Sequence, residues 1–537
     1  MTDRQAGRAT RRGYGRSRHV PDGVILAIAC VAQFMVVLDV SIVNVALPSI
    51  GRDLHYTASG LQWVVNAYVL TFAGFLLLGG RAADLFGRRR VFLFGLGLFT
   101  VASLAGGVAT DSTWLTAARA VQGIGGALLS PATLTIIVTT FAPQRRAWAL
   151  GIWSAVAGAG GAAGSILGGV LTSALSWRWV LFVNIPIGIA GIIAGMLWLT
   201  ESRASDRTSQ AGDRLAPRLD VAGAVTVTLG LGALVYAIVG TETHPWGSAQ
   251  TLILLAIAVV LLAAFAVIEL RLVSTPLVPF SLFRSRSVTG ANTVMFLVGA
   301  AFFAMWYFLS LYLQNVLGYS ALRAGMAFLP MAVSIIIGAQ ASSRLMPRTG
   351  VRPLLLAGTI LATAGFGWLS RITPGASYWQ HVFGPGCIIA LALGVLFTPL
   401  AGAATAGVSY SEAGLASGVL NTSRQIGGSL GLAVLATIAT DHTLALIRGT
   451  TAGGAAGQQA GLSYGQHSPA VTAAYSAGYA RAFEVAAALT LAAFLASFIV
   501  PAIRNRRAPA GQAGDQATGQ QDAAPTDAAP TDDAARR

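Results

Sequence analysis

Apolar residues dominate this chain in long blocks, and short polar stretches separate one block from the next. Each block is long enough to cross the hydrocarbon core of a bilayer as one helix. The pattern therefore predicts an all-α polytopic membrane protein with fourteen spans. The predicted spans are residues 24–47, 61–80, 91–110, 113–138, 147–171, 179–199, 221–240, 251–270, 288–312, 324–345, 353–371, 381–404, 415–440 and 482–503.

The chain also repeats itself at a distance of about half its length. Gly160-Gly161-x-x-Gly164 recurs as Gly427-Gly428-x-x-Gly431, and Leu128-Leu129-Ser130-Pro131 recurs as Leu396-Phe397-Thr398-Pro399. Such repeats around a midplane site are typical of secondary transporters. We therefore expect an N-terminal six-helix bundle at 23–200, a linker with two inserted helices at 201–272, and a C-terminal six-helix bundle at 273–503.

Composition supports a membrane protein and excludes an ordinary soluble enzyme. Of 537 residues, 55% are hydrophobic and only 10% are charged, with a mean hydropathy of +0.67. A soluble domain has about 25% charged residues. All 35 basic residues are Arg. The absence of Lys excludes a Walker A loop, so ATP is not expected as a partner, and it suggests a GC-rich bacterial gene.

The Arg residues also predict the orientation in the bacterial inner membrane. If both termini are cytoplasmic, 27 of the 35 Arg residues lie on the cytoplasmic side and 6 outside, as the positive-inside rule requires. This distribution accounts for the basic pI without nucleic acid. Three segments lie outside the membrane in this scheme: an Arg-rich tail at 1–22, where anionic headgroups of membrane lipid can bind, an outer loop at 441–480, and a disordered tail at 504–537.

Two charged side chains lie deep inside predicted spans. Asp39 is about 13 Å below the outer end of its helix, and Arg119 is about 10 Å deep from the same side. Intramembrane charges are costly, so a paired or functional role is the first hypothesis. Burial favours the neutral form of a carboxyl group, whereas a neighbouring guanidinium favours the ionised form. We predict that Asp39 and Arg119 couple transport to protons; the alternative is a static ion pair.

The loop between the second and third spans combines an acid with several cations. It contains Asp84, Gly87, Arg88 and Arg89, and glycine permits a tight turn there. Such a cluster can hold helix ends together in one conformation and release them in another. We predict a conformational latch, and the alternative is an Arg cluster that acts only as a topology signal.

Small residues recur along one face of the span at 147–171. The residues are Gly160, Gly164, Gly168 and Gly169, which lets a neighbouring helix approach closely. An overlapping match to a dinucleotide-binding fingerprint has no preceding strand, and we reject it.

Polar and aromatic side chains elsewhere in the spans are candidates for a substrate cavity. We assign Asn44, Gln122, Trp306, Tyr307 and Arg424 to it, because aromatic and a few polar groups line ligand pockets. Lipid contact or ordinary packing is the alternative for the aromatics, and a structural tie is the alternative for Arg424. The His residues form no metal-binding motif, so no metal and no cofactor is expected.

Together these segments resemble the major facilitator superfamily, and within it the fourteen-span drug:proton antiporters. Residues 80–90, 115–127 and 160–169 are similar to three motifs of that family, and 38–48 is similar to a motif of the fourteen-span branch. Ser165 stands where the family usually has Pro. The resemblance implies that Arg119 is the coupling arginine and that the glycine motif belongs to antiporters.

These observations predict a proton-coupled exporter of bulky lipophilic drugs or antibiotics that confers resistance by alternating access. One alternative is a proton-coupled nutrient symporter, which the antiporter motif disfavours. A second alternative is a membrane-embedded enzyme or receptor, which would need clustered catalytic groups. The sequence contains no such cluster, so we expect no enzymatic activity.

Overall fold

The computed structural model describes residues 21–57, 60–201, 220–242, 244–273, 276–278, 280–406, 408, 413–448 and 469–502. The regular elements in these ranges are all helical, which confirms the predicted all-α class. Thirteen described helices are long and apolar enough to cross a membrane. The remaining predicted span corresponds to α5, Pro143–Ala174, whose described apolar stretch, Ala159–Ala174, is shorter. The count of fourteen therefore stays a prediction.

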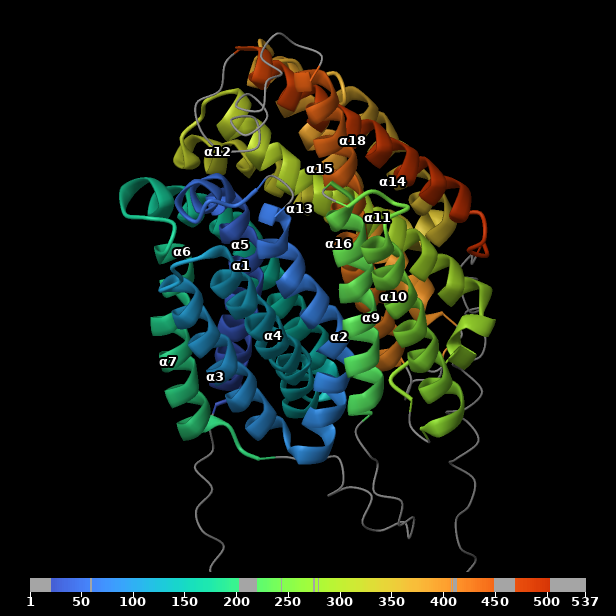
Figure 1. The fold of residues 1–537 in the computed structure, drawn as a ribbon. Helices are drawn as coiled ribbons and strands as arrows, with labels where there is room; N and C mark the ends of the chain where they lie inside the picture. The colour runs from blue at the N-terminus through green and yellow to red at the C-terminus, as the bar shows by residue number, and fades with distance from the viewer. Residues whose placement is uncertain are drawn as a thin grey trace, which may run out of the picture.

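The first bundle contains the helices up to residue 198 (Figure 1). The long helices α1, α2, α4 and α5 pack closely in pairs, with α2 against α4 and α1 against α5. The sixth predicted span is broken near Val183 into a short α6 and a longer α7. The helices of this bundle are α1 (Asp22–Asp53), α2 (Trp63–Phe86), α3 (Arg88–Gly107), α4 (Ser112–Thr140), α5, α6 (Trp179–Phe182) and α7 (Asn184–Trp198).

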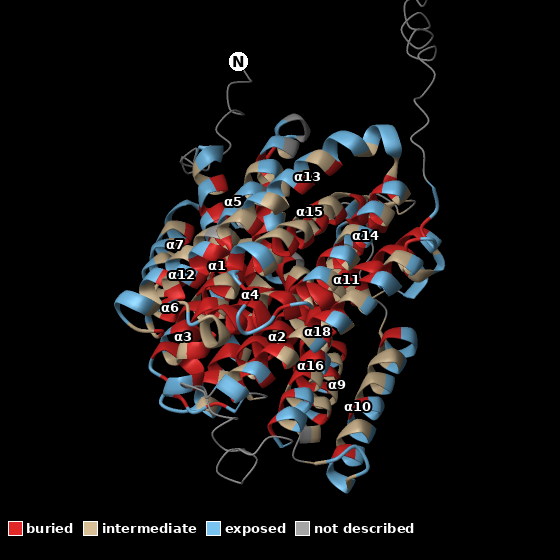
Figure 2. Ribbon diagram, turned by 90° about the horizontal axis from the view of Figure 1, so that it is seen from above, coloured by how far each residue is buried: buried red, intermediate tan, exposed pale blue. Residues whose placement is uncertain are grey.

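The inserted pair consists of α9 (Val221–Val239) and α10 (Ala249–Val267), and it lies beside the junction of the two bundles. Helix α9 packs against α2 and α16, whereas α10 packs on α9 (Figure 1). Most of α10 is exposed or only partly buried (Figure 2) although its sequence is strongly apolar. An exposed apolar helix of this kind is suited to face lipid.

The second bundle begins at α11 and ends with α18. Helix α11 continues into a π-helical turn, η5 (Tyr312–Val316), and the tenth predicted span is broken near Phe328. The helices are α11 (Arg286–Leu311), α12 (Ala321–Ala327), α13 (Leu329–Thr349), α14 (Val351–Leu369), α15 (Gly384–Thr405), α16 (Ala413–Arg448) and α18 (Pro469–Ala496).

The predicted outer loop at 441–480 and the predicted last span at 482–503 have the wrong bounds. Helix α16 runs on to Arg448, and α18 already begins at Pro469 and ends at Ala496. Tyr475 and Tyr479 are buried in the bundle, so tertiary packing extends the helix beyond the apolar run. Residues 449–468 and the predicted tail at 504–537 lie outside the described residues, as do residues 1–20.

The same glycine pattern brings two pairs of helices together, one pair in each bundle. In α5, a methyl group at Gly164 would lie 2.6 Å from Cβ of Ser41 in α1. In α16, a methyl group at Gly431 would lie 2.3 Å from Cα of Ala300 in α11. Helix α5 therefore packs on α1 as α16 packs on α11, which agrees with the internal repeat.

We call the end at which α1 begins the inner end of the molecule, and the opposite end the outer end. Four hydrogen bonds join the two bundles in the outer half of the described ranges. In these bonds Ser310 Oγ donates to the Asn44 carbonyl, Gln314 Nε2 to the Val45 carbonyl, the Leu322 amide to Ser173 Oγ, and Ser429 Oγ to Asn66 Oδ1. The bundles are thus tied together on the outer side.

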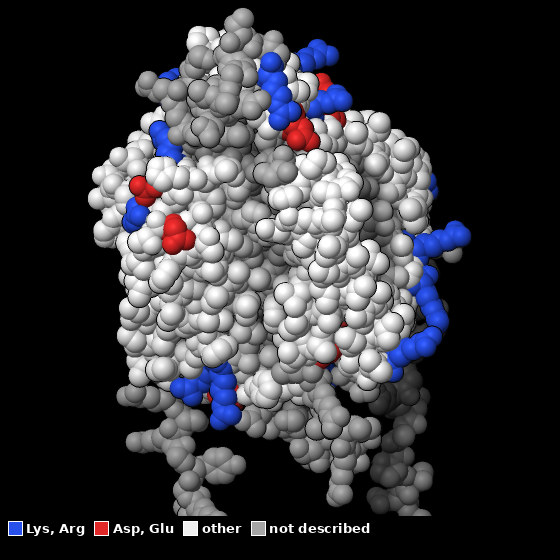
Figure 3. Space-filling view, in the orientation of Figure 1, with Lys and Arg blue, Asp and Glu red and all other residues white. Residues whose placement is uncertain are grey.

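Charge is distributed as expected for a chain that crosses a membrane. In the space-filling view of Figure 3, the middle of the molecule shows an almost uncharged band, with Arg and acidic side chains toward its edges. The assignment of the inner end to the cytoplasm rests on the Arg distribution and stays a prediction.

Candidate functional site

The two predicted intramembrane charges form a buried ion pair inside the first bundle. Arg119 Nη1 lies 2.5 Å from Asp39 Oδ2, and the side chains are 2% and 0% exposed. Arg119 comes from α4 and Asp39 from α1, so residues 80 positions apart meet. The sequence predicts only that the two charges lie at similar depth, and the structure shows that they are in contact. Because the pair is neutral as a whole, it can be held in a low-dielectric interior at lower cost than either charge alone.

Neutral polar groups complete the coordination of the Asp39 carboxylate. Its Oδ1 atom accepts hydrogen bonds from Gln122 Nε2 at 2.8 Å and from Asn184 Nδ2 at 3.0 Å. The Ser103 hydroxyl lies within hydrogen-bonding distance of both amides, at 2.8 and 3.3 Å. Both carboxylate oxygens accept from donors, which is the arrangement of an ionised carboxyl group.

The Arg119 guanidinium is held on several sides at once. Its Nε donates to the Val64 carbonyl at 3.0 Å, and Nη1 also donates to Gln122 Oε1 at 2.6 Å. The guanidinium carbon lies 4.5 Å from the centre of the Tyr68 ring, which gives a cation–π contact. A planar group with donors in a fixed fork suits this set of partners better than an ammonium does.

Close approach of α2 and α4 keeps this site compact. A methyl group at Gly123 would lie 2.4 Å from the carbonyl oxygen of Tyr68, and one at Gly125 would lie 2.6 Å from the Phe99 amide nitrogen. The two glycines closely follow Gln122 on α4 and allow backbone contact with both α2 and α3. The small residues of this segment thus position Arg119 and Gln122 against Asp39.

The inner loop holds helix ends together within the first bundle. Arg89 Nη2 donates to the Met196 carbonyl at 2.7 Å and Nε to the Gly195 carbonyl at 3.3 Å, so it binds the last turn of α7. Arg90 lies 3.6 Å from Glu201. Gly87 has φ of 103°, a conformation that favours glycine. Arg88 is half-buried, and the Asp84 side chain lies outside the described part of the structure.

The glycine motif of α5 contacts both bundles. A methyl group at Gly160 would lie 3.0 Å from the Phe34 carbonyl oxygen, and one at Gly168 would lie 2.8 Å from that of Ile42. Gly169 instead faces the second bundle, where a methyl group would lie 2.7 Å from the Ala321 carbonyl oxygen.

Ser165 takes part in the same contact between α5 and α1. Its hydroxyl lies 3.1 Å from the hydroxyl of Ser41, which donates to the Gly161 carbonyl at 2.6 Å. The position that usually holds Pro in the related motif therefore provides a polar link between the two helices.

The residues predicted to line one substrate cavity lie in different parts of the structure. Gln122 belongs to the Asp39 site, and Asn44 lies farther along α1, where its backbone carbonyl binds Ser310. Trp306 is half-buried, with its ring centre 5.0 Å from that of Phe328. Arg424 is half-buried on α16, with its guanidinium carbon 5.6 Å from the centre of the Phe397 ring.

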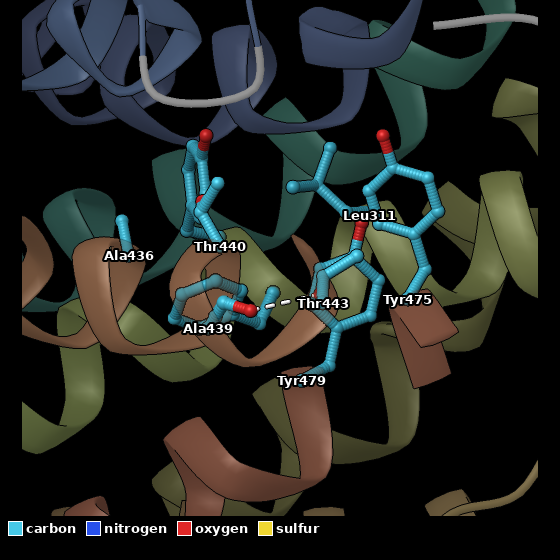
Figure 4. Close-up of a pocket in the computed structure, with 9 residues that line it drawn as sticks. Leu311, Ala436, Ala439, Thr440, Thr443, Tyr475 and Tyr479 are labelled. Carbon is cyan, nitrogen blue, oxygen red and sulfur yellow. Dashed lines mark hydrogen bonds between the residues drawn. The ribbon is translucent and has the colours of Figure 1, made fainter. Parts of the chain in front are cut away.

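Tyr307 lies in the interior of the second bundle and not beside Arg424. It is 1% exposed and borders a cavity among α11, α16 and α18 (Figure 4). Tyr475, Tyr479 and Thr443 line the same cavity, whose free volume of about 20 Å³ suffices for one water molecule. A drug cannot be accommodated there in this conformation.

Sequence reasoning gave no role to three polar contributors to the site, Asn184, Ser103 and Tyr68. Asn184 begins α7 directly after the break in the sixth span, and the break directs its amide toward Asp39. Ser103 and Tyr68 carry no charge, so nothing in the apolar pattern distinguishes them from ordinary packing residues.

The chain is similar to known proteins in both sequence and structure. Residues 29–432 match the family model of the Major Facilitator Superfamily. The cephamycin export protein CmcT of Amycolatopsis lactamdurans is 46% identical over 78% of this chain and 85% of its own. The puromycin resistance protein pur8 of Streptomyces alboniger is 41% identical over 79% of this chain and 82% of its own.

Among solved structures, a bacterial homolog of the human lysosomal transporter Spinster, in an inward-facing and occupied conformation, has the same fold. The TM-score is 0.61 with 18% identity, and the match covers 91% of this chain and 99% of that one.

Proposed function

The chain belongs to the Major Facilitator Superfamily, and on that premise we propose that it exports antibiotics or other lipophilic drugs from a bacterial cell against protons. The relatives described above are named as export and resistance proteins, which supports export over nutrient uptake. The same names support a transporter rather than an enzyme.

The observation that carries proton coupling is the buried pair of Asp39 and Arg119. A coupled proton needs a group that is charged in one state and neutral in another. Arg stays protonated in proteins, so within the pair only Asp39 can take up and release the proton. Its full burial means that the proton must enter or leave in a different conformation.

The contacts between the bundles indicate which step of the cycle this conformation represents. The outer side is closed by the hydrogen bonds of Ser310, Gln314 and Leu322, and Asp39 has the contacts of an ionised group. In antiport, this is the state after the proton has left toward the cytoplasm and before the drug moves outward. Drug binding and protonation then favour opposite states, and linkage makes their effects reciprocal.

The test begins with a drug-susceptibility panel in a host that lacks its own pumps. The compound against which the chain protects most is then used for uptake into everted vesicles with an imposed pH gradient. We expect Asp39→Asn to abolish uphill uptake while downhill exchange of the compound persists. Wild-type uphill uptake by Asp39→Asn, with unchanged pH dependence, would remove Asp39 from the coupling mechanism. If the wild type protects against no compound, the export function itself is wrong.

A further inference from the structure

Arg424 differs from Arg119, the buried arginine of the first bundle, because no acidic side chain in the described ranges pairs with it. The ion pairs in the described ranges are Arg90–Glu201, Asp39–Arg119, Asp53–Arg178 and Arg481–Glu484. Arg424 is in none of them. Its Nε atom is buried without a hydrogen-bond partner, and Phe397 provides only a ring face at 5.6 Å.

The backbone of α16 fixes the position of this cation. Gly299 of α11 packs directly on it, since a methyl group there would lie 2.4 Å from the Arg424 carbonyl oxygen. Gly427 of α16 packs on Phe296 of α11 in the same way, at 2.1 Å from its carbonyl oxygen. Arg424 therefore projects from the part of α16 that is most closely packed against α11.

The side chain lies on a polar face of α16 that points away from the contacts with α2. Ser417 and Asn421 lie seven and three residues before Arg424, which places all three on one face at 3.6 residues per turn. Residues of α16 that contact α2, such as Gly418 and Ser429, are about 120–140° away around the helix. Arg424 and Asn421 are half-buried and Ser417 is exposed, so the exposure of this polar face increases toward the inner end.

One aromatic ring lies against the cation, and a second lies one turn farther along the helix. Phe397 lies against the guanidinium from α15, and Phe303 of α11 covers Gly428, one turn beyond Arg424. A positive charge embedded in a transmembrane helix is costly unless an anion or water compensates it. The pair of Asp39 and Arg119 is neutral, whereas the positive charge of Arg424 has no acidic partner in the part of the chain that the structure describes.

We propose that Arg424 is the counter-ion for an anionic group of the exported molecule, and that the chain accepts amphipathic organic anions with an aromatic or apolar body and one carboxylate or sulfonate. This inference rests on the proposed export function. The planar guanidinium can bind a carboxylate or sulfonate through two donors at once. The rings of Phe397 and Phe303 provide contact area for the apolar body, and a monoanion neutralises the site.

The test uses three dansyl probes that share one ring system and differ in charge: dansylglycine, dansylglycinamide and dansylcadaverine. Binding is measured by fluorescence with the full chain in phosphatidylcholine nanodiscs. We expect the wild type to bind the anionic dansylglycine most tightly. Arg424→Gln should weaken dansylglycine binding about tenfold or more, because hydrogen bonds to a charged group are lost. The same variant should change dansylglycinamide binding less than about threefold.

Two further variants separate charge from structure. Arg424→Lys keeps the positive charge and should recover part of the dansylglycine affinity. Arg352→Gln is the matched control, because Arg352 also lies over a phenyl ring, that of Phe498 at 5.0 Å, at the inner end of α14. We expect this control to bind all three probes as the wild type does.

The inference is overturned if Arg424→Gln weakens the three probes equally, or if the wild type does not prefer dansylglycine over its amide. It is also overturned if phosphatidylglycerol fills the site, so that dansylglycine fails to bind whenever this lipid is present. Proton-driven efflux from proteoliposomes separates a failure of the Arg424 inference from a failure of the proposed export function. Efflux of neutral compounds with no preference for anions removes the Arg424 inference alone, whereas no proton-driven efflux of any compound removes the export function.

Discussion

Replacement of Arg119 by Lys tests whether the buried pair needs the geometry of a guanidinium or only its charge. Lys can approach Asp39 and keep the pair neutral. It cannot at the same time donate to the Val64 carbonyl, donate to Gln122 and lie flat over the Tyr68 ring, as Arg119 does. The substitution therefore removes contacts and keeps the net charge.

The expected loss follows from the contacts that an ammonium cannot make. A hydrogen bond from a charged donor contributes about 1.5–3 kcal/mol, and a desolvated cation–π contact about 0.5–2 kcal/mol. Some compensation by the ammonium group reduces the sum, so we expect Arg119→Lys to lower the free energy of unfolding by about 2–4 kcal/mol. Arg119→Ala should lose about 3–5 kcal/mol, because it leaves the Asp39 carboxylate buried and unpaired.

The matched control is Arg178→Lys. Arg178 also combines an ion pair, with Asp53 at 2.6 Å, and a ring contact, with Trp177 at 4.5 Å. Its side chain is 34% exposed and that of Asp53 is 47% exposed, so water screens the pair. Surface pairs contribute about 0–1 kcal/mol, and the control should therefore change little.

The assay is thermal unfolding of the purified variants in one detergent at one scan rate, together with uphill transport in everted vesicles. We expect the unfolding midpoint to fall in the order wild type, Arg119→Lys, Arg119→Ala, and transport to be strongly reduced in both variants. Equal midpoints and equal transport for the wild type and Arg119→Lys would refute the geometric argument and leave charge alone as the requirement.

Three shorter predictions test other parts of the structure. A reporter fused after residue 510 should report the cytoplasm and one inserted within 450–470 the outside; the reverse at 450–470 would contradict the predicted topology. Asp84→Asn should impair transport while the protein still reaches the membrane, and normal efflux would reduce the inner loop to a topology signal. Gly164→Ala should lower the free energy of unfolding by about 1–3 kcal/mol, because the new methyl group overpacks against α1. Gly161→Ala is the control and should not, since its methyl group would lie 4.0 Å from the nearest side-chain atom. Equal stabilities of the two variants would contradict the close packing.

The sequence predicts the spans and the central ion pair for a clear physical reason. Bilayer thickness sets the length of each apolar run, and a charge inside such a run needs a partner. Asp39 and Arg119 were placed at similar depth by counting residues, and the structure brings them into contact. The comparisons confirm the family that the motifs suggested.

Other features depend on tertiary contacts that periodicity does not contain. The aromatics Trp306 and Tyr307 are neighbours in sequence, yet one is half-buried beside Phe328 and the other is enclosed within its own bundle. Residue type alone does not give the rotation of a helix about its axis. The start of α18 was missed because its first turns are rich in small and polar residues and are held by packing rather than by an apolar run.

The internal repeat also shows that the two halves have diverged in the charges they carry. Gly160 packs on Phe34 as Gly427 packs on Phe296, so Asp39 of α1 corresponds to Ala301 of α11. The match of Leu128 to Leu396 relates Arg119 to Cys387. The second half therefore lacks the ion pair, and it carries Arg424 where the first half has Ala157. The proposed proton site and the proposed substrate cation therefore lie in different bundles.

Coupling between the halves requires an element that contacts both the Asp39 site and the second bundle. Helix α1 makes both contacts. Asp39 lies in the middle of α1, and Asn44 and Val45, about one and a half turns farther on, accept the hydrogen bonds of Ser310 and Gln314 from the second bundle. Neutralising Asp39 removes the charge that holds α1 against Arg119 of α4. A small shift of α1 would reach the outer contacts directly, because they lie on the same rigid helix. We infer that α1 transmits the protonation state of Asp39 to the outer contacts between the bundles.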